Sequence, residues 1–246
     1  MTGKVTVTFV GSGDAFGSGG RMQACILVDD GTQRTLVDCG ASSLIGMKRL
    51  GIDPNSIDAV VLSHLHGDHF GGIPFLVLDG QFSRRERPLK VIGPEGVKDR
   101  VRAAMEVFFP GSSTVQRRFE TVVEEIGVGT AIKVGDASVR AFAADHASGA
   151  PAHILRFELG GRVIAYSGDT SWTPGLVEAA RGADLLICEA YFRERRVPFH
   201  LSYGELLEHR AEIDCVRIVL THLTTEMIEA ADVELERASD GLVVEV

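Results

Sequence analysis

At its centre the chain reads Ser63-His64-Leu65-His66-Gly67-Asp68-His69, directly after the apolar run Ala59-Val60-Val61-Leu62. A short continuous apolar run is typical of a strand that is buried on both faces. Such a strand delivers the side chains that follow it to a cleft at its carboxyl end. Four of those side chains are of the types that bind divalent metals, and together they have no obvious packing use. The segment therefore predicts a metal site.

The segment could serve two metals. If it is extended, alternate residues share a side, so His64 and His66 face one way, whereas the neighbours Asp68 and His69 point apart. Two hydrolytic metals with an open position need about three protein ligands each and a bridge, which is more than four residues supply. Further ligands must come from downstream.

Three downstream residues are candidates, and each closes a strand-like run: His146, Asp169 and His222. The carboxyl ends of strands are where open α/β sheets place their ligand-binding residues. His153 lies seven positions after His146 (153 − 146 = 7) and competes with it. Because His153 begins a strand and His146 ends one, His146 is the favoured ligand.

The order of the predicted elements indicates an α/β protein of two packed sheets with helices on their outer faces, because strands dominate the first half and strands alternate with helices in the second. Strands are predicted at 4–10, 24–28, 35–38, 59–62, 90–92, 121–125, 131–134, 139–143, 153–158, 162–167, 185–189 and 218–221. Helices are predicted at 43–50, 97–108, 174–181, 202–212 and 226–235. The glycine-rich segment 11–20 lacks the phosphate-loop motif and is predicted to be a loop on the substrate side.

The histidine motif, His146, Asp169 and His222 follow one another in the order found in the metallo-β-lactamase superfamily. The chain resembles that superfamily over essentially its whole length, from Val5 to His222. The resemblance implies a four-layer αββα sandwich, one domain over residues 1–246 and a hydrolase with two divalent ions, zinc first, with manganese or iron as alternatives. The implied ligands are His64, His66 and His146 for one ion, Asp68, His69 and His222 for the other, and Asp169 as the bridge.

Within the superfamily the chain is most similar to the branch of ribonuclease Z and related phosphodiesterases. The signal is Phe199-His200-Leu201-Ser202 upstream of Val219-Leu220-Thr221-His222-Leu223. The resemblance implies that His200 binds no metal and faces the scissile phosphate, as a general acid or as a charge that stabilises it. Asp68 is expected to orient the nucleophile. Asp68 and His200 are thus the predicted catalytic residues.

One departure from ribonuclease Z bears on the substrate. Ribonuclease Z typically carries a long arm that grips tRNA between the third histidine ligand and the bridging aspartate, whereas here only 23 positions (169 − 146 = 23) separate His146 from Asp169. The formal charge of −9 also disfavours a general polyanion-binding surface. We therefore expect a phosphodiesterase that acts on a cyclic phosphodiester or a short nucleic acid.

Three alternatives stay open. They are a tRNA 3′-processing endoribonuclease, a lactone, thioester or β-lactam hydrolase with the same metals, and a nucleic-acid-binding module without catalysis. Basic residues at 84–90, 117–118 and 193–196 are interpreted as solvated surface, with phosphate contact as the alternative.

The location and assembly of the protein are predicted from weaker signals. No apolar stretch is long enough to cross a bilayer, and the amino terminus lacks the regions of a signal peptide. Cys25, Cys39, Cys188 and Cys215 are dispersed without a C-x-x-C pair, as in proteins of a reducing cytoplasm. A cytoplasmic protein is expected, and a homodimer is possible by analogy with relatives.

Overall fold

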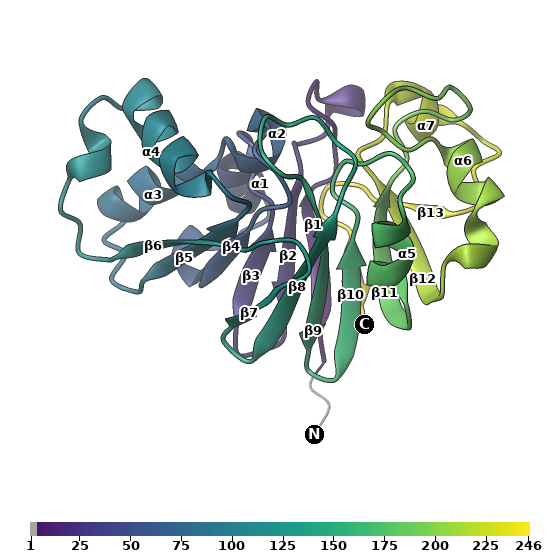
Figure 1. Ribbon diagram of the computed structural model, residues 1–246. Helices are drawn as coiled ribbons and strands as arrows, with labels where there is room; N and C mark the ends of the chain where they lie inside the picture. Colours follow the sequence, from purple (N-terminus) through teal and green to yellow (C-terminus); the bar gives the residue numbers. More distant parts are fainter. Residues whose placement is uncertain (1–3) are drawn as a thin grey trace.

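The computed structural model describes residues 4–246, and within that range it contains two seven-stranded sheets that face each other (Figure 1). The first sheet has the order β14 (Val243–Glu245), β1 (Thr6–Gly11), β2 (Cys25–Asp29), β3 (Arg34–Val37), β4 (Ala59–Val61), β5 (Leu89–Gly93) and β6 (Thr121–Glu125). The second has the order β13 (Glu236–Arg237), β12 (Cys215–Thr221), β11 (Ala183–Glu189), β10 (Arg162–Tyr166), β9 (His153–Leu159), β8 (Ala137–Ala143) and β7 (Ala131–Val134).

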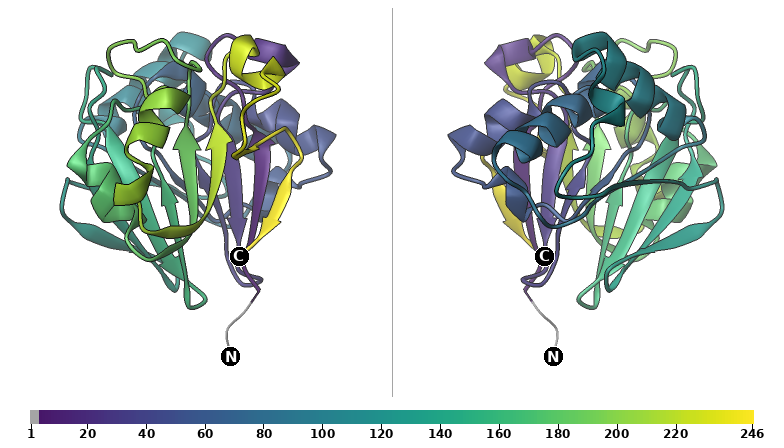
Figure 2. Two further views of the ribbon diagram at one scale, coloured as in Figure 1. Left: turned by 90° about the vertical axis from the view of Figure 1, so that its right-hand side faces the viewer. Right: turned by 90° about the vertical axis from the view of Figure 1, so that its left-hand side faces the viewer.

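Helices cover the outer face of each sheet, as the two side views in Figure 2 show. On the first sheet lie α1 (Ser43–Arg49), α3 (Ile73–Phe82) and α4 (Val97–Phe108). On the second lie α5 (Pro174–Ala180), α6 (Tyr203–Glu208) and α7 (Thr225–Glu229). The order of layers is therefore helix, sheet, sheet, helix, and the predicted αββα sandwich is confirmed.

Three clusters of buried apolar side chains hold these layers together. The inner cluster joins the sheets and includes Phe9, Val139, Phe157 and Ile187. The two outer clusters fix the helices to the sheets. Full burial of each such side chain stabilises the fold by roughly 1.5–3 kcal/mol. Both sheets contribute side chains to the inner cluster, and the single domain stays a prediction.

Strand direction decides where functional side chains gather. Strands β3, β4, β5 and β6 are parallel to one another, and so are β10, β11, β12 and β13. The carboxyl ends of both parallel groups lie at the edge of the sandwich that is uppermost in Figure 1. Loops that follow these strands therefore meet across the gap between the sheets.

The structure differs from the sequence-based prediction at the helices. The helix predicted over 226–235 ends at Glu229, because the guanidinium of Arg237 binds the carbonyl oxygens of Met227, Ile228 and Ala230. The helix predicted over 202–212 is α6 followed by a separate 3₁₀ turn at Arg210–Glu212.

Other elements were not predicted. Helix α3 was missed because its sequence Ile-Pro-Phe-Leu-Val-Leu is apolar on all sides and shows no helical period. The short strands β13 and β14 were also missed. No helix within residues 4–246 is both long and apolar enough to span a membrane.

Arg85 is a structural residue. It is 3% exposed, and its guanidinium donates hydrogen bonds to the carbonyl oxygens of Pro54, Ile57, Arg87 and Pro88. These carbonyls lie in the loops before β4 and before β5. The interpretation of Arg85 as solvated surface is therefore wrong, and the phosphate-contact alternative fails for it as well, because the guanidinium fixes two loops inside the protein.

We predict that Arg85→Leu lowers the free energy of unfolding by about 3 kcal/mol, because buried carbonyl groups lose a charged donor. Urea denaturation followed by circular dichroism measures the change, with the exposed neighbour Arg84→Ala as control. Equal stability of the two variants would contradict this role.

Candidate metal centre

Seven side chains meet at the carboxyl ends of the strands. His64 and His66 lie in the loop after β4, and Asp68 and His69 lie in the one-turn helix α2 (Gly67–Phe70) that continues it. His146, Asp169 and His222 follow β8, β10 and β12. Their ligand-type atoms form two groups, each within 4.8 Å: His64, His66 and His146, and Asp68, His69, Asp169 and His222.

One expectation about this segment is wrong. Asp68 and His69 do not point apart, since His69 Nε2 lies 3.3 Å from Asp68 Oδ2 and both side chains belong to the second group. The extended conformation ends at His66, and the turn of α2 brings these neighbours to the same side. The segment still serves two groups, because the change from extended to helical backbone lies between His66 and Asp68.

The other candidate histidines lie outside these two groups. His153 is buried at the start of β9, and burial lowers its pKa to about 4. His209 stacks on Trp172 with 4.2 Å between ring centroids. The structure therefore brings His146 to the site, as preferred, and leaves His153 and His209 apart from it.

Three of the histidines are oriented by a hydrogen bond from the ring nitrogen that faces away from the site. His64 Nδ1 lies 3.1 Å from Ser63 Oγ, His69 Nδ1 lies 2.6 Å from Asp38 Oδ2, and His146 Nδ1 lies 2.9 Å from the Phe199 carbonyl oxygen. Metal-binding histidines typically have such a partner, which fixes the tautomer and aims the other nitrogen at the metal.

Asp38 is a buried carboxylate that orients His69 directly and holds Ser63, which contacts His64. Besides His69, it accepts hydrogen bonds from the Ser63 backbone N–H, the Ser63 hydroxyl and the Tyr166 hydroxyl, at 2.7–2.8 Å. Ser63 follows β4 in the first sheet, whereas Tyr166 ends β10 in the second. One carboxylate thus ties both sheets to the ligand loop.

Asp169 lies between the two groups. Its Oδ1 is 3.3 Å from His69 Nε2, and its Oδ2 is 3.6 Å from His222 Nε2 and 3.8 Å from His64 Nε2. The side chain is 3% exposed. Asp169 Oδ2 therefore faces one imidazole from each group.

The chemistry of the donors fits divalent cations. His64 Nε2, His69 Nε2 and Asp169 Oδ1 are buried without a hydrogen-bond partner, which is unfavourable unless something else binds them. His66 Nδ1 and His146 Nε2 face each other at 3.0 Å. Buried imidazole and carboxylate groups that converge in this way are typical ligands of zinc and similar metals.

The histidines of the two groups differ in the direction of their pKa shifts. Burial, together with the neighbouring His69, lowers the pKa of His64 well below its ordinary value, so its imidazole is neutral and can bind a cation. Burial alone would lower the pKa of His69, but the carboxylates of Asp169, Asp68 and Asp38 raise it well above the ordinary value. The second group thus carries the stronger negative potential.

His200 lies at the rim of the centre. Its Nδ1 is 3.0 Å from Glu189 Oε2 and 3.9 Å from Asp169 Oδ2, and its ring stacks on Tyr191 at 4.7 Å between centroids. Glu189 is buried, and its other oxygen accepts a hydrogen bond from the Thr170 N–H. The carboxylate and the stacked ring hold His200 in place and leave Nε2 available for a substrate.

Asp38 and Glu189 were missed as functional residues in the sequence. Both stand at the carboxyl end of a predicted strand, as His146, Asp169 and His222 do. The same rule of strand ends therefore contained the signal. The strand-end position is the signal that the sequence offers for either residue.

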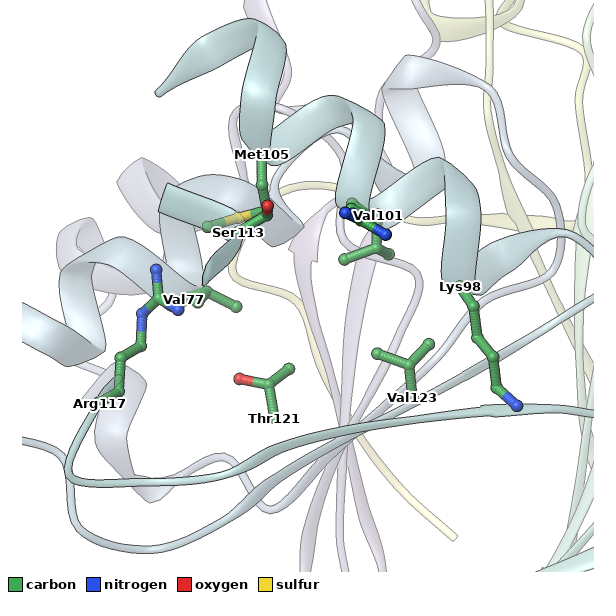
Figure 3. Close-up of a pocket in the computed structure, with 9 residues that line it drawn as sticks. Val77, Lys98, Val101, Met105, Ser113, Arg117, Thr121 and Val123 are labelled. Carbon is green, nitrogen blue, oxygen red and sulfur yellow. The ribbon is translucent and has the colours of Figure 1, made fainter. Parts of the chain in front are cut away.

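Four of the nine basic residues in the three clusters form ion pairs. The ion pairs are Arg87–Asp58, Lys90–Glu124, Arg193–Asp232 and Arg196–Glu208. Arg117 donates to the Ser112 carbonyl oxygen and lines a pocket of about 190 Å³ between α4 and β6 (Figure 3). None of the described residues that line this pocket belongs to the metal-type groups.

The chain is similar to proteins of known family and fold. A family model described as "Anti-Pycsar protein Apyc1" matches residues 5–242. Ribonuclease Z from Methanosarcina mazei is 25% identical over 271 aligned positions that cover 89% of this chain and 87% of that protein.

Solved structures share the fold over nearly the whole chain. The metallo-β-lactamase fold protein YhfI from Bacillus subtilis has a TM-score of 0.81 at 21% identity and covers 99% of this chain and 100% of its own. The short form of human tRNase Z has a TM-score of 0.80 at 24% identity, with 97% and 98% covered. The expected resemblance to the metallo-β-lactamase superfamily and to its ribonuclease Z branch is therefore confirmed.

We predict that Asp38→Asn weakens metal binding about 10- to 100-fold, because the amide cannot accept hydrogen bonds at both positions and His69 loses its fixed orientation. Competition with a chromogenic chelator for Zn²⁺ or Mn²⁺ measures the change. Tyr166→Phe removes one donor but keeps the carboxylate, so its effect should be smaller. An Asp38→Asn protein with wild-type affinity would refute this dependence.

Proposed function

The chain belongs to the Anti-Pycsar protein Apyc1 family, and from this membership and the geometry of the centre we propose that it is a metal-dependent phosphodiesterase of cyclic or short phosphodiesters. The observation that carries the proposal is the convergence of seven ligand-type side chains beside the His200–Glu189 pair. Relatives named ribonuclease Z support it, since a ribonuclease cleaves phosphodiester bonds.

A small substrate is supported by what lies between His146 and Asp169. This segment consists of a loop, β9, β10 and the Gly160-Gly161 turn between them, so the described chain holds no arm there. The alignment with the Methanosarcina mazei protein has more positions than this chain has residues. At least 25 positions of that alignment (271 − 246 = 25) therefore have no counterpart in this chain. The net charge of −9 likewise disfavours a long polyanion.

Two divalent ions are the proposed cofactors, with zinc as the first expectation. His64, His66 and His146 would hold one, Asp68, His69 and His222 the other, and Asp169 would contact both. Bound there, the ions would polarise a phosphoryl oxygen and lower the pKa of water so that a nucleophile exists at neutral pH.

The chain's own residues supply orientation and proton transfer. Asp68 Oδ2 lies 3.3 Å from both His69 Nε2 and His222 Nε2. The other carboxylate oxygen is proposed to orient the attacking water. His200, held at Nδ1 by Glu189 Oε2, is proposed to donate a proton from Nε2 to the leaving oxygen.

The tRNA 3′-processing reaction and the hydrolysis of lactones, thioesters or β-lactams are alternatives that substrate tests separate. The homodimer and the cytoplasmic location stay predictions.

We predict that purified protein with Zn²⁺ or Mn²⁺ hydrolyses bis(p-nitrophenyl) phosphate and that His200→Ala lowers kcat by about 100-fold or more with unchanged metal content, because general acid catalysis is lost. His209→Ala is the matched control, since His209 stacks on Trp172 away from the centre. An unchanged rate in His200→Ala removes it from the mechanism, and turnover of a chromogenic lactone or β-lactam alone rejects the phosphodiesterase proposal.

Asp169→Ala tests the bridging position. Because Asp169 lies near ligands of both groups, we expect the variant to lose most of its metal on dialysis, as measured by atomic absorption. Retention of both ions would disprove the bridge.

A further inference from the structure

The pocket between α4 and the edge strand β6 combines apolar walls with polar groups (Figure 3). Its volume is about 190 Å³. The apolar walls come from three elements: Val77 on α3, Val101 and Met105 on α4, and Val123 on β6. The other lining residues are polar, namely Lys98, Arg102, Ser113, Arg117 and Thr121. A concave apolar surface with a few polar groups is the usual form of a small-molecule site.

The polar part of this lining is positive, although the chain as a whole is acidic. Lys98, Arg102 and Arg117 line the pocket, and none of its nine lining residues is acidic. The chain has a net charge of −9. Among the described residues, the ion pairs leave these three cations without an acidic partner. A ligand that complements the lining is therefore an anion.

Two polar atoms of this lining, Arg117 Nε and Thr121 Oγ1, are buried and have no hydrogen-bond partner within residues 4–246. The other two nitrogens of the Arg117 guanidinium donate to the carbonyl oxygens of Ser112 and Val115, at 2.7 and 3.2 Å. These bonds fix the guanidinium on its loop, so the Nε–H is the donor that remains for a ligand. Figure 3 shows the Thr121 hydroxyl directed toward the side of the pocket on which Arg117 lies. Buried donors without a partner are unfavourable and call for a further group.

We propose that this pocket binds a small organic carboxylate with an aliphatic chain, at a site separate from the metal centre. One carboxylate oxygen accepts from Arg117 Nε and the other from the Thr121 hydroxyl, so both buried donors gain a partner. The aliphatic chain lies against the valines and Met105, and the two cations of α4 attract the anion.

The donors and the size of the pocket select the ligand. A carboxylate offers two oxygens to two donors, whereas a phosphoryl group would leave a further charged oxygen against apolar walls. Pockets for drug-sized ligands usually measure about 300–1,000 Å³, so this smaller pocket suits a short chain.

Methionine methyl NMR of the full chain tests the site. The probe is hexanoate, with acetate as the anion without the chain and hexan-1-ol as the chain without the charge. Hexanoate should bind with a Kd of about 1 mM or lower. It should shift the methyl signal of Met105 but not that of Met227, which packs between α7 and the other sheet. Acetate and hexan-1-ol should each bind at least about tenfold more weakly, because each lacks one part of the interaction.

Variants of the two donors test the placement of the carboxylate. Thr121→Val removes the hydroxyl at similar volume and should weaken hexanoate binding about tenfold, without loss of a bond inside the described protein. Arg117→Met should weaken it by about tenfold or more. Arg118→Met, at an exposed neighbour that does not line the pocket, is the matched control and should keep the wild-type Kd. Circular dichroism checks that each variant is folded.

Each result decides for or against the proposal. If the Met105 signal stays in place at hexanoate concentrations about tenfold above the expected Kd, the site is rejected. Hexan-1-ol that binds as tightly as hexanoate would show an apolar pocket without anion recognition, and acetate that binds as tightly would show a site for a simple anion only. Wild-type affinity in Thr121→Val would reject the placement of the carboxylate. Because no readout uses catalysis, these outcomes are independent of the phosphodiesterase proposal.

Discussion

The buried carboxylate of Asp38 is the constraint on which the rest of the centre depends. It accepts hydrogen bonds from the N–H and hydroxyl of Ser63, from the hydroxyl of Tyr166 and from His69 Nδ1. Burial of a carboxylate is costly unless its oxygens are fully hydrogen-bonded, and here four donors satisfy them. The same bonds join the loop after β4 in the first sheet to the end of β10 in the second.

Backbone strain is concentrated at residues of the candidate metal centre. The described residues other than glycine with positive φ are Asp38, Arg84, Phe199 and His222. Three of them lie at the centre: Asp38 orients His69, Phe199 accepts from His146, and His222 is itself a candidate ligand. A conformation that is locally unfavourable persists when surrounding contacts require it, which is typical of functional sites. The geometry of the ligands is thus maintained by the packed sandwich.

The partners of the basic residues and the net charge bear on the size of the substrate. Most cations of the three basic clusters form ion pairs or bind carbonyl oxygens, and the chain has a net charge of −9. Long nucleic acids are bound mainly through many phosphate contacts, so a surface of this kind offers them little. Under the proposed function, recognition of a short substrate rests on the centre itself, where the candidate metal ligands and His200 lie together.

The sequence by itself determined the ligand types, their order and the strand ends that carry them, because a buried strand followed by a histidine motif is a local pattern. It also determined the four-layer architecture through the resemblance of those motifs. Only the tertiary structure decided which atoms meet, since the decisive contacts join residues that are distant in sequence. Asp38 and Tyr166 are 128 positions apart, and Asp68 and His222 are 154 apart. Sheet packing makes them neighbours, and no local pattern encodes that distance.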